Sequence, residues 1–272
     1  MRDELISRWN LDLGNIRQHL DKILSGIDFP KNMRGRPFKR KPKTYVKLLV
    51  LKEYFGCSLR KAECLLSERI DHSVLHFWEK RLDKQFIERL VGSIAKRLKI
   101  GYDFSFVDST MFTTWKNRFA DLHIMARISK ETVYPVSIFF GKASPSNAVK
   151  ATLVEGSGKV LGDRWYDDNK TFKVLIKNGY TPIVKAQRTR CSGSWRRKAR
   201  IVYDKRVYRQ RGRGESIFGS LTNEFGDRLK SVRPDVTMTR IACRFIVYLV
   251  KLIMRQRTCS TTASFVVTFW NY

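Results

Sequence analysis

The chain has 272 residues, which is long enough to bury a core and to form one large domain or two smaller ones. It carries 54 Lys and Arg against 25 Asp and Glu, a net charge of +29, and 43% of its residues are hydrophobic. This composition excludes a disordered basic tail, and the excess charge predicts a polyanionic partner, with nucleic acid favoured over a membrane surface.

Other protein classes are also excluded by the sequence. No run of about 18 uncharged apolar residues is present, so we expect no membrane span and no membrane partner. The five cysteines are scattered and never form a Cys-x-x-Cys pair, which is typical of free thiols in a reducing compartment. No apolar segment of signal-peptide length follows the first residues. We therefore expect a cytoplasmic protein associated with the nucleoid.

The first 43 residues are expected to form a helix and an arm. Apolar residues spaced three and four apart predict an amphipathic packing helix within residues 1–30. Residues 31–43 contain seven basic residues, two prolines and no acid, which predicts a basic arm that follows phosphates. The expected DNA contacts of the arm are Arg36, Lys39 and Arg40.

Residues 44–100 are predicted to be helical. Three short helices are expected over residues 45–55, 59–66 and 72–82, with Thr44, Ser58 and Asp71 as their capping residues. Such helices fit either a DNA-binding helix-turn-helix, with the third helix in the recognition position, or a plain packing module. His72 and His76 have metal-ligand spacing but no third ligand nearby, so we expect them at the surface or facing DNA.

The strand predicted over residues 102–110 leads to a carboxylate. A change of period from 3.6 to two places a domain boundary at residues 99–101. Tyr102, Phe104 and Phe106 alternate onto one face, and Asp108 is the next residue on that face. Because an unpaired buried charge is costly, Asp108 either caps the following turn or faces a cation.

The following elements predict a mixed sheet over residues 101–257. They are strands over 122–128 and 133–140, a helix from Asn147 to Val154, a strand over 159–161, a helix over 169–178 and a strand over 181–186. This order predicts an α/β ribonuclease H-like fold, in which the first strand and the later parallel strand lie side by side. Asp163 directly follows the strand over 159–161. Asp167 and Asp168 are the alternatives to Asp163 as the second carboxylate, although Asp168 is better placed to cap the next helix.

The last part of the chain supplies a third carboxylate. Residues 185–213 hold twelve basic residues against the single acid Asp204, which predicts either a solvated loop or phosphate contacts. A helix is expected over residues 215–225, with Glu215 on its inward face. A basic amphipathic helix over residues 238–255 is expected to pack on the sheet, and the aromatic tail over 258–272 to form a strand or a dimer contact.

Three segments together resemble the DDE transposases of bacterial and archaeal insertion sequences. They are Val107-Asp108-Ser109-Thr110, Gly162-Asp163-Arg164-Trp165-Tyr166-Asp167 and the spacing Tyr208-(2)-Arg211-(3)-Glu215. The resemblance covers roughly residues 104–225. It departs from the family at Thr222, where these proteins usually have a lysine seven residues after the glutamate.

The resemblance implies that Asp108, Asp163 and Glu215 are catalytic residues that hold two Mg²⁺ or Mn²⁺ ions. Hard oxygen ligands suit these ions, and two cations suit an in-line displacement at phosphorus. It also implies that Tyr208 and Arg211 hold DNA near the cleaved bond. The further expected DNA contacts are Arg196, Arg197, Lys198 and Arg213.

The sequence therefore predicts a transposase that binds terminal inverted repeats, cleaves DNA in a metal-dependent reaction and transfers the 3′-OH ends. Double-stranded DNA is the expected partner, a homodimer is the expected active form, and no small-molecule substrate is expected. The alternative is an inactive or domesticated DNA-binding protein derived from such an element, for which Thr222 is the support. A general nuclease with the same fold is a third candidate.

Overall fold

The computed structural model describes residues 14–29, 38–65, 69–114, 119–187, 192–226 and 228–269. The chain divides into two compact units, one made of Met1–Asp83 with Thr239–Tyr272 and the other of Lys84–Met238. The division therefore lies before the boundary predicted at residues 99–101. Helix α5 (Lys84–Ala95) belongs with the sheet because it packs along strand β3 (Val133–Phe140).

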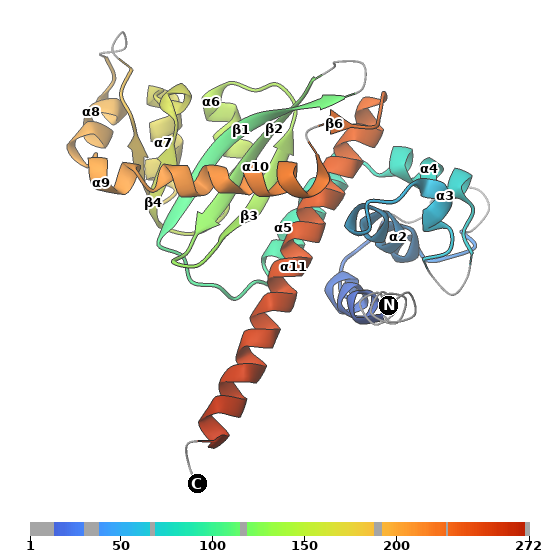
Figure 1. Cartoon of the computed structure of the whole chain (residues 1–272). Coiled ribbons are helices and arrows are strands. Elements are labelled where there is room, and N and C mark those ends of the chain that lie inside the picture. The colour runs from blue at the N-terminus through green and yellow to red at the C-terminus, as the bar shows by residue number, and fades with distance from the viewer. Residues whose placement is uncertain are drawn as a thin grey trace. The chain divides into compact units, whose positions relative to one another are not determined.

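The first unit is helical (Figure 1). It contains a helix over residues 14–24, α2 (Pro42–Tyr54), α3 (Leu59–Ala62), α4 (His72–Arg81) and most of α11 (Pro234–Phe269). The predicted caps of α3 and α4 are confirmed, since Ser58 accepts the Lys61 N–H at 3.3 Å and Asp71 accepts the Ser73 N–H at 2.7 Å. Thr44 is not a cap. Helix α2 begins earlier, at a proline whose fixed φ suits the first helical turn.

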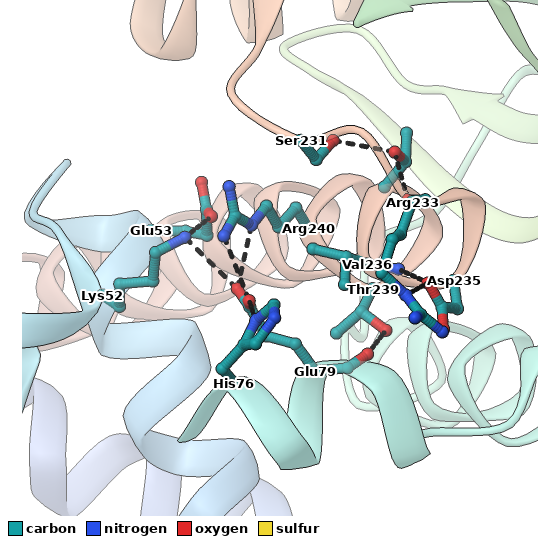
Figure 2. A network of polar contacts seen from close by, with 11 residues as sticks. Lys52, Glu53, His76, Glu79, Ser231, Arg233, Asp235, Val236, Thr239 and Arg240 are labelled. Atoms are coloured by element: carbon teal, nitrogen blue, oxygen red, sulfur yellow. Dashed lines mark hydrogen bonds and ion pairs between the residues drawn. The ribbon is translucent and has the colours of Figure 1, made fainter. Parts of the chain in front are cut away.

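A buried ion network joins α2, α4 and α11 in this unit (Figure 2). The Glu79 carboxylate on α4 is 1% exposed and accepts two hydrogen bonds from Arg240 on α11, at 2.9 and 3.0 Å. Lys52 on α2 approaches Glu79 to 3.6 Å and also pairs with Glu53, which Arg244 approaches to 3.4 Å. Helix α11 thus packs on α2 and α4 of this unit, and its predicted packing on the sheet stays a prediction. It remains helical to Phe269, so the predicted tail is no strand up to that residue.

The second unit is built on a six-stranded mixed sheet. Its strands are β1 (Phe104–Thr114), β2 (Phe119–Ile128), β3, β4 (Gly158–Gly162), β5 (Tyr180–Val184) and β6 (Arg228–Leu229). The order is β3-β2-β1-β4-β5, with β6 paired to the far end of β1. Strands β1 to β3 form an antiparallel meander, while β4 and β5 run parallel to β1. This is the strand order that a ribonuclease H-like fold requires.

Helices cover both faces of this sheet. They are α6 (Pro145–Thr152), the 3₁₀ turn η1 (Arg164–Tyr166), α7 (Asn169–Lys177), α8 (Ser194–Ile201), α9 (Lys205–Tyr208) and α10 (Arg211–Phe225). Helices α6 and α7 form the connections from β3 to β4 and from β4 to β5, and two right-handed connections in the same direction lie on one face. Helix α10 crosses the other face (Figure 1).

Local capping explains where these helices begin. Asp168 accepts the Thr171 N–H at 3.1 Å and so caps α7, as predicted. The segment over residues 185–213, for which a loop was one prediction, contains α8 and α9 because Asn169 and Asp204 accept N–H groups at the starts of these helices. Within the described residues, no helix combines the length and the apolar character that crossing a bilayer requires.

Candidate active site

Two of the three predicted carboxylates, Asp108 in β1 and Asp163 directly after β4, lie at neighbouring positions because the two strands are adjacent. The parallel register of β1 and β4 pairs Val107 with Gly162, so the next residue on each strand path is an aspartate, Asp108 or Asp163. Asp163 caps η1 by accepting the Trp165 N–H. A side chain at Gly162 would begin 3.2 Å from Val107, so glycine keeps the two strand ends tightly packed.

The third carboxylate, Glu215, reaches the same face of the sheet on α10. A Cβ atom at Gly214 would lie 2.5 Å from the Phe106 ring, so the helix can approach the sheet this closely only at a glycine. Phe106 and Asp108 lie two residues apart on β1 and therefore point to the same face. Gly214 had no predicted role, although a glycine directly before the acidic residue of a predicted helix was an available signal.

Asp163 and Glu215 act electrostatically on Asp108. Burial raises the pKa of Asp108 to about 6, and the negative charges of Asp163 and Glu215 add to the increase. The Ser109 N–H, 2.8 Å from the Asp108 carboxylate, opposes this shift, as does the charge of Arg211. The oxygen atoms of the three carboxylates do not all lie within 4.8 Å of one another. Among the described residues, the only three metal-ligand atoms within 4.8 Å of one another belong to Glu63, Asp71 and His72.

The predicted Tyr-Arg-Glu spacing forms a continuous set of contacts. Arg211 Nη1 lies 2.7 Å from Glu215 Oε1 one helical turn away, and the Arg211 guanidinium lies 5.9 Å from the centre of the Tyr208 ring. Arg211 therefore partly neutralises Glu215 in the structure. Helix α10 begins at Arg211, before the predicted start at Glu215, so Arg211 and Glu215 lie one turn apart on the same helix.

The transposase DDE domain family matches the chain over residues 99–250, more than half of its length. The chain belongs to the DDE transposase family. An uncharacterized protein of Aquifex aeolicus is 24% identical over 260 residues, which cover 82% of this chain and 81% of that protein. The matched region of this DDE transposase contains all three carboxylates and the mixed sheet that carries them.

Tyr166 lies beside the predicted carboxylates and had no predicted role. Its side chain is 1% exposed, and burial raises the pKa of its hydroxyl, with the charges of Asp108 and Asp163 adding to the increase. A hydrogen bond with the Ser109 side chain opposes this shift. A protonated hydroxyl therefore lies close to both aspartates.

Asp167 and Arg196 form a buried pair, which corrects the prediction that Arg196 contacts DNA and removes Asp167 as an alternative to Asp163. Arg196 Nε lies 2.8 Å from Asp167 Oδ1, Gln187 N–H donates to Asp167 Oδ2 at 2.7 Å, and both side chains are nearly buried. Asp167 is thus fully engaged within the protein and is no rival to Asp163. Arg196, which was expected to contact DNA, is instead 5% exposed and holds α8 in place.

The remaining predicted DNA contacts lie in different environments. Arg197 and Lys198 are exposed on α8, as are Lys39 and Arg40 before α2. Arg213 donates to the carbonyls of Ser129 and Lys130, at 2.5 and 2.8 Å, so its guanidinium also fixes the turn between β2 and β3. Arg36 lies outside the described residues.

The two histidines of α4 do not share a site. His72 Nδ1 lies 2.6 Å from Glu63, whereas His76 Nδ1 lies 3.3 Å from Glu79. Glu63 is also bonded by Arg69 at 2.8 Å and by the His72 N–H at 2.9 Å. These contacts neutralise Glu63 and tie the connection between α3 and α4 to the start of α4.

Proposed function

We propose that the protein is the transposase of an insertion sequence. In this proposal it binds double-stranded DNA at the terminal inverted repeats of its element, cleaves the ends and joins the 3′-OH groups to a target. The observation that carries the proposal is the position of Asp108, Asp163 and Glu215, on three separate elements of a DDE domain. We expect a homodimer during the reaction, because two ends must be paired, and a location on the nucleoid in the cytoplasm.

The donor set of this site fits a hard divalent cation. Three carboxylates supply oxygen ligands, and a partly buried Asp108 with a raised pKa is a group that gains from a nearby positive charge. Asp108, Asp163 and Glu215 would hold Mg²⁺ or Mn²⁺. When bound, two such cations activate the attacking oxygen and stabilise the leaving oxygen of an in-line displacement.

The surrounding residues have distinct roles in this proposal. Asp108 must be ionised to act as a ligand, which its pKa of about 6 permits at neutral pH. Arg211 holds Glu215 at 2.7 Å in the structure. A DNA phosphate would compete for the Arg211 guanidinium and so release the Glu215 carboxylate as a ligand. Tyr208 supports Arg211 through its ring.

Cleavage of DNA that carries the sequences flanking the reading frame tests the proposal. The wild-type protein should cleave in Mg²⁺ and not in EDTA. Asp108→Asn, Asp163→Asn and Glu215→Gln should abolish cleavage and retain DNA binding. Asp103→Asn, an exposed acid just before β1, is the matched control and should leave cleavage intact. Cleavage by all three site variants at the wild-type rate would overturn the proposal.

The alternative of an inactive DNA-binding protein rests on one position. Thr222 is exposed on α10, its hydroxyl bonds the Phe218 carbonyl at 2.9 Å, and it stands where the family usually has a lysine. The same assay separates an active transposase from an inactive DNA-binding protein, because the inactive protein binds the flanking DNA without cutting it. A general nuclease would instead cut unrelated DNA equally well.

A further inference from the structure

A buried histidine lies on the strand next to β1. His123 of β2 is 5% exposed and pairs in the sheet with Ser109, the residue after Asp108. Directly paired residues of an antiparallel sheet point to the same face, and successive residues of a strand point to opposite faces. His123 therefore lies on the face of the sheet opposite to the Asp108 side chain. Any effect of His123 on the carboxylates must pass through another residue.

The imidazole of His123 is neutral, and only one of its nitrogens is satisfied. Nε2 lies 3.1 Å from the Gly141 carbonyl oxygen, so this nitrogen carries the proton and donates the hydrogen bond. Burial lowers the pKa of His123, although the Gly141 carbonyl and the charge of Asp121 oppose this shift. Nδ1 is also buried, and it has no hydrogen-bond partner among the described residues. A buried acceptor without a partner destabilises a fold, so stability alone does not account for a histidine here.

The ring of His123 packs on an aromatic residue of the segment that carries Asp163. The His123 and Trp165 rings are stacked, with their centroids 5.7 Å apart and their planes 12° apart. The Phe139 ring of β3 also lies beside His123, at 5.9 Å and 30°. Ring pairs at these separations attract one another. The imidazole thus links the end of β3 to η1, on the other side of β1.

Trp165 connects this stack to the Asp163 carboxylate. It is the second residue of η1, and its N–H donates to Asp163. Its ring also meets Tyr166 edge to face, with the centroids 4.9 Å apart. A displaced indole would move the backbone of η1 and the N–H that it donates. The orientation of Asp163 therefore depends on where the Trp165 ring is held.

We propose that His123 is a positioning residue of the carboxylate site, whose ring holds Trp165 and η1 so that Asp163 is oriented to bind the divalent cation. This inference rests on the proposed function and adds to it a residue that acts through Trp165. Replacement of a residue that orients a metal ligand typically lowers metal affinity by about 10–100-fold.

Calorimetric titration of the full chain with Mn²⁺ tests this role through two variants that separate the ring from its hydrogen bond. His123→Phe keeps a flat ring against Trp165 and loses the bond to Gly141. His123→Gln retains an amide that can donate to Gly141 and loses the ring. We expect wild-type Mn²⁺ affinity for His123→Phe and a loss of about 10–100-fold for His123→Gln.

Trp165→Ala removes the other ring of the stack and provides a second test. It should weaken Mn²⁺ binding to a similar extent. The double variant with His123→Gln should bind little more weakly than either single variant, because both changes break the same contact.

Leu90→Ala is the matched control for destabilisation. Leu90 is buried in α5, which carries none of the stacked rings. This variant should unfold at a lower temperature in EDTA and keep the wild-type Mn²⁺ affinity. Thermal unfolding also checks that the ring variants are folded.

Cleavage of the DNA that flanks the reading frame gives a further readout. The Mg²⁺ concentration for half-maximal cleavage should rise in His123→Gln by the factor that its Mn²⁺ affinity falls. The rate at saturating Mg²⁺ should return toward that of the wild type, because the carboxylates themselves are intact.

The positioning role is overturned if His123→Gln binds Mn²⁺ as the wild type does, or if His123→Phe and His123→Gln lose affinity equally. It is also overturned if Leu90→Ala loses as much affinity as His123→Gln, since destabilisation would then explain the effect. Failure of the proposed function has a different result, because the wild-type protein would then cleave no flanking DNA in Mg²⁺.

Discussion

The pKa values of two carboxylates, one in each unit, are shifted in opposite directions. Glu79 of the helical unit is surrounded by cations of the chain (Figure 2). Burial alone would raise its pKa, but the hydrogen bonds from Arg240 and the charge of Lys52 hold the pKa of Glu79 below its usual value. The pKa of Asp108 in the sheet unit is raised to about 6, mainly by burial, and the charges of Asp163 and Glu215 add to the increase.

This difference separates structural from functional charge. A carboxylate that holds helices together is neutralised by the protein itself, as Glu79 is by Arg240 and Asp167 is by Arg196. Asp108 in β1 instead has a raised pKa, caused mainly by burial and further by the charges of Asp163 and Glu215, so a bound cation would stabilise its ionised form. Asp163 and Asp167 lie four residues apart and fall on the two sides of this division.

The largest expected effect is on activity. Asp108→Asn should lower Mg²⁺-dependent cleavage by about a thousandfold or more, because several kcal/mol of charge stabilisation are lost at about 1.36 kcal/mol per tenfold. Its free energy of unfolding in EDTA should be unchanged or higher, since a repelling charge is removed. Single-turnover cleavage and urea denaturation measure the two quantities, and a large loss of stability would contradict the comparison.

Glu79→Gln should behave in the reverse manner. The substitution removes the buried carboxylate that accepts both Arg240 hydrogen bonds and lies near Lys52, and we expect about 3–5 kcal/mol of unfolding free energy to be lost. Urea denaturation measures this loss. Cleavage per folded molecule should remain, and a wild-type denaturation midpoint for Glu79→Gln would show that the network contributes little.

Two neighbouring arginines of α8 sharpen the comparison within the sheet unit. Arg196→Ala should cost about 3–5 kcal/mol of stability, because it removes the guanidinium that pairs with the buried Asp167 carboxylate. Arg197→Ala, at an exposed position, should change stability by less than about 0.5 kcal/mol. It should instead lower the dependence of DNA affinity on salt by about one unit of log–log slope. Equal effects of the two variants on stability would contradict the burial of Arg196.

The dependence of stability on pH should distinguish the two carboxylates in metal-free protein. The pKa of Asp108 is raised, so its ionisation penalises folding above pH 6, and this penalty disappears as the pH falls toward the unfolded pKa of about 4. The stability advantage of Asp108→Asn over wild type should therefore grow from pH 4 to about 6 and then stay constant. Glu79 has a lowered pKa, and its contribution is lost as the pH falls below about 4.

Thermal unfolding in EDTA across this pH range measures both trends. Addition of Mg²⁺ at pH 7.5 should abolish the difference in stability between wild type and Asp108→Asn, because the cation stabilises the ionised Asp108 carboxylate. A gap that ignores both pH and Mg²⁺ would show that Asp108 is not under electrostatic repulsion.

The smallest expected effect comes from Thr222→Lys. One added phosphate contact on exposed α10 should steepen the salt dependence of DNA binding by about 0.9 in log–log slope and leave stability unchanged. Affinity measured at several salt concentrations tests this. An unchanged slope would show that DNA does not pass this position.

Much of the sheet unit follows from local sequence patterns. Alternating apolar residues gave the strand that leads to Asp108, and strand β3 was predicted over the residues it occupies. Asp168 was predicted to cap α7 from its position alone. Such features depend on neighbours in sequence, so a pattern can predict them.

Features that depend on distant neighbours were missed. The basic segment after β5 gave no sign that Arg196 would turn inward, because its partner Asp167 is 29 residues away. The role of Gly214 depends on the Phe106 ring of another element, and Tyr166 is near Asp108 only because β1 and β4 are paired. The division between the two units lies before the predicted boundary for a similar reason, since α5 packs along β3, which comes later in the chain.

Calorimetric titration with Mn²⁺ tests the central claim most directly. The claim is that the carboxylates of Asp108 and Asp163 together bind an external cation. The wild-type protein should bind Mn²⁺, the Asp108→Asn, Asp163→Asn double variant should lose this binding, and Glu63→Gln should retain it. Equal Mn²⁺ binding by the wild type and the double variant would contradict the claim.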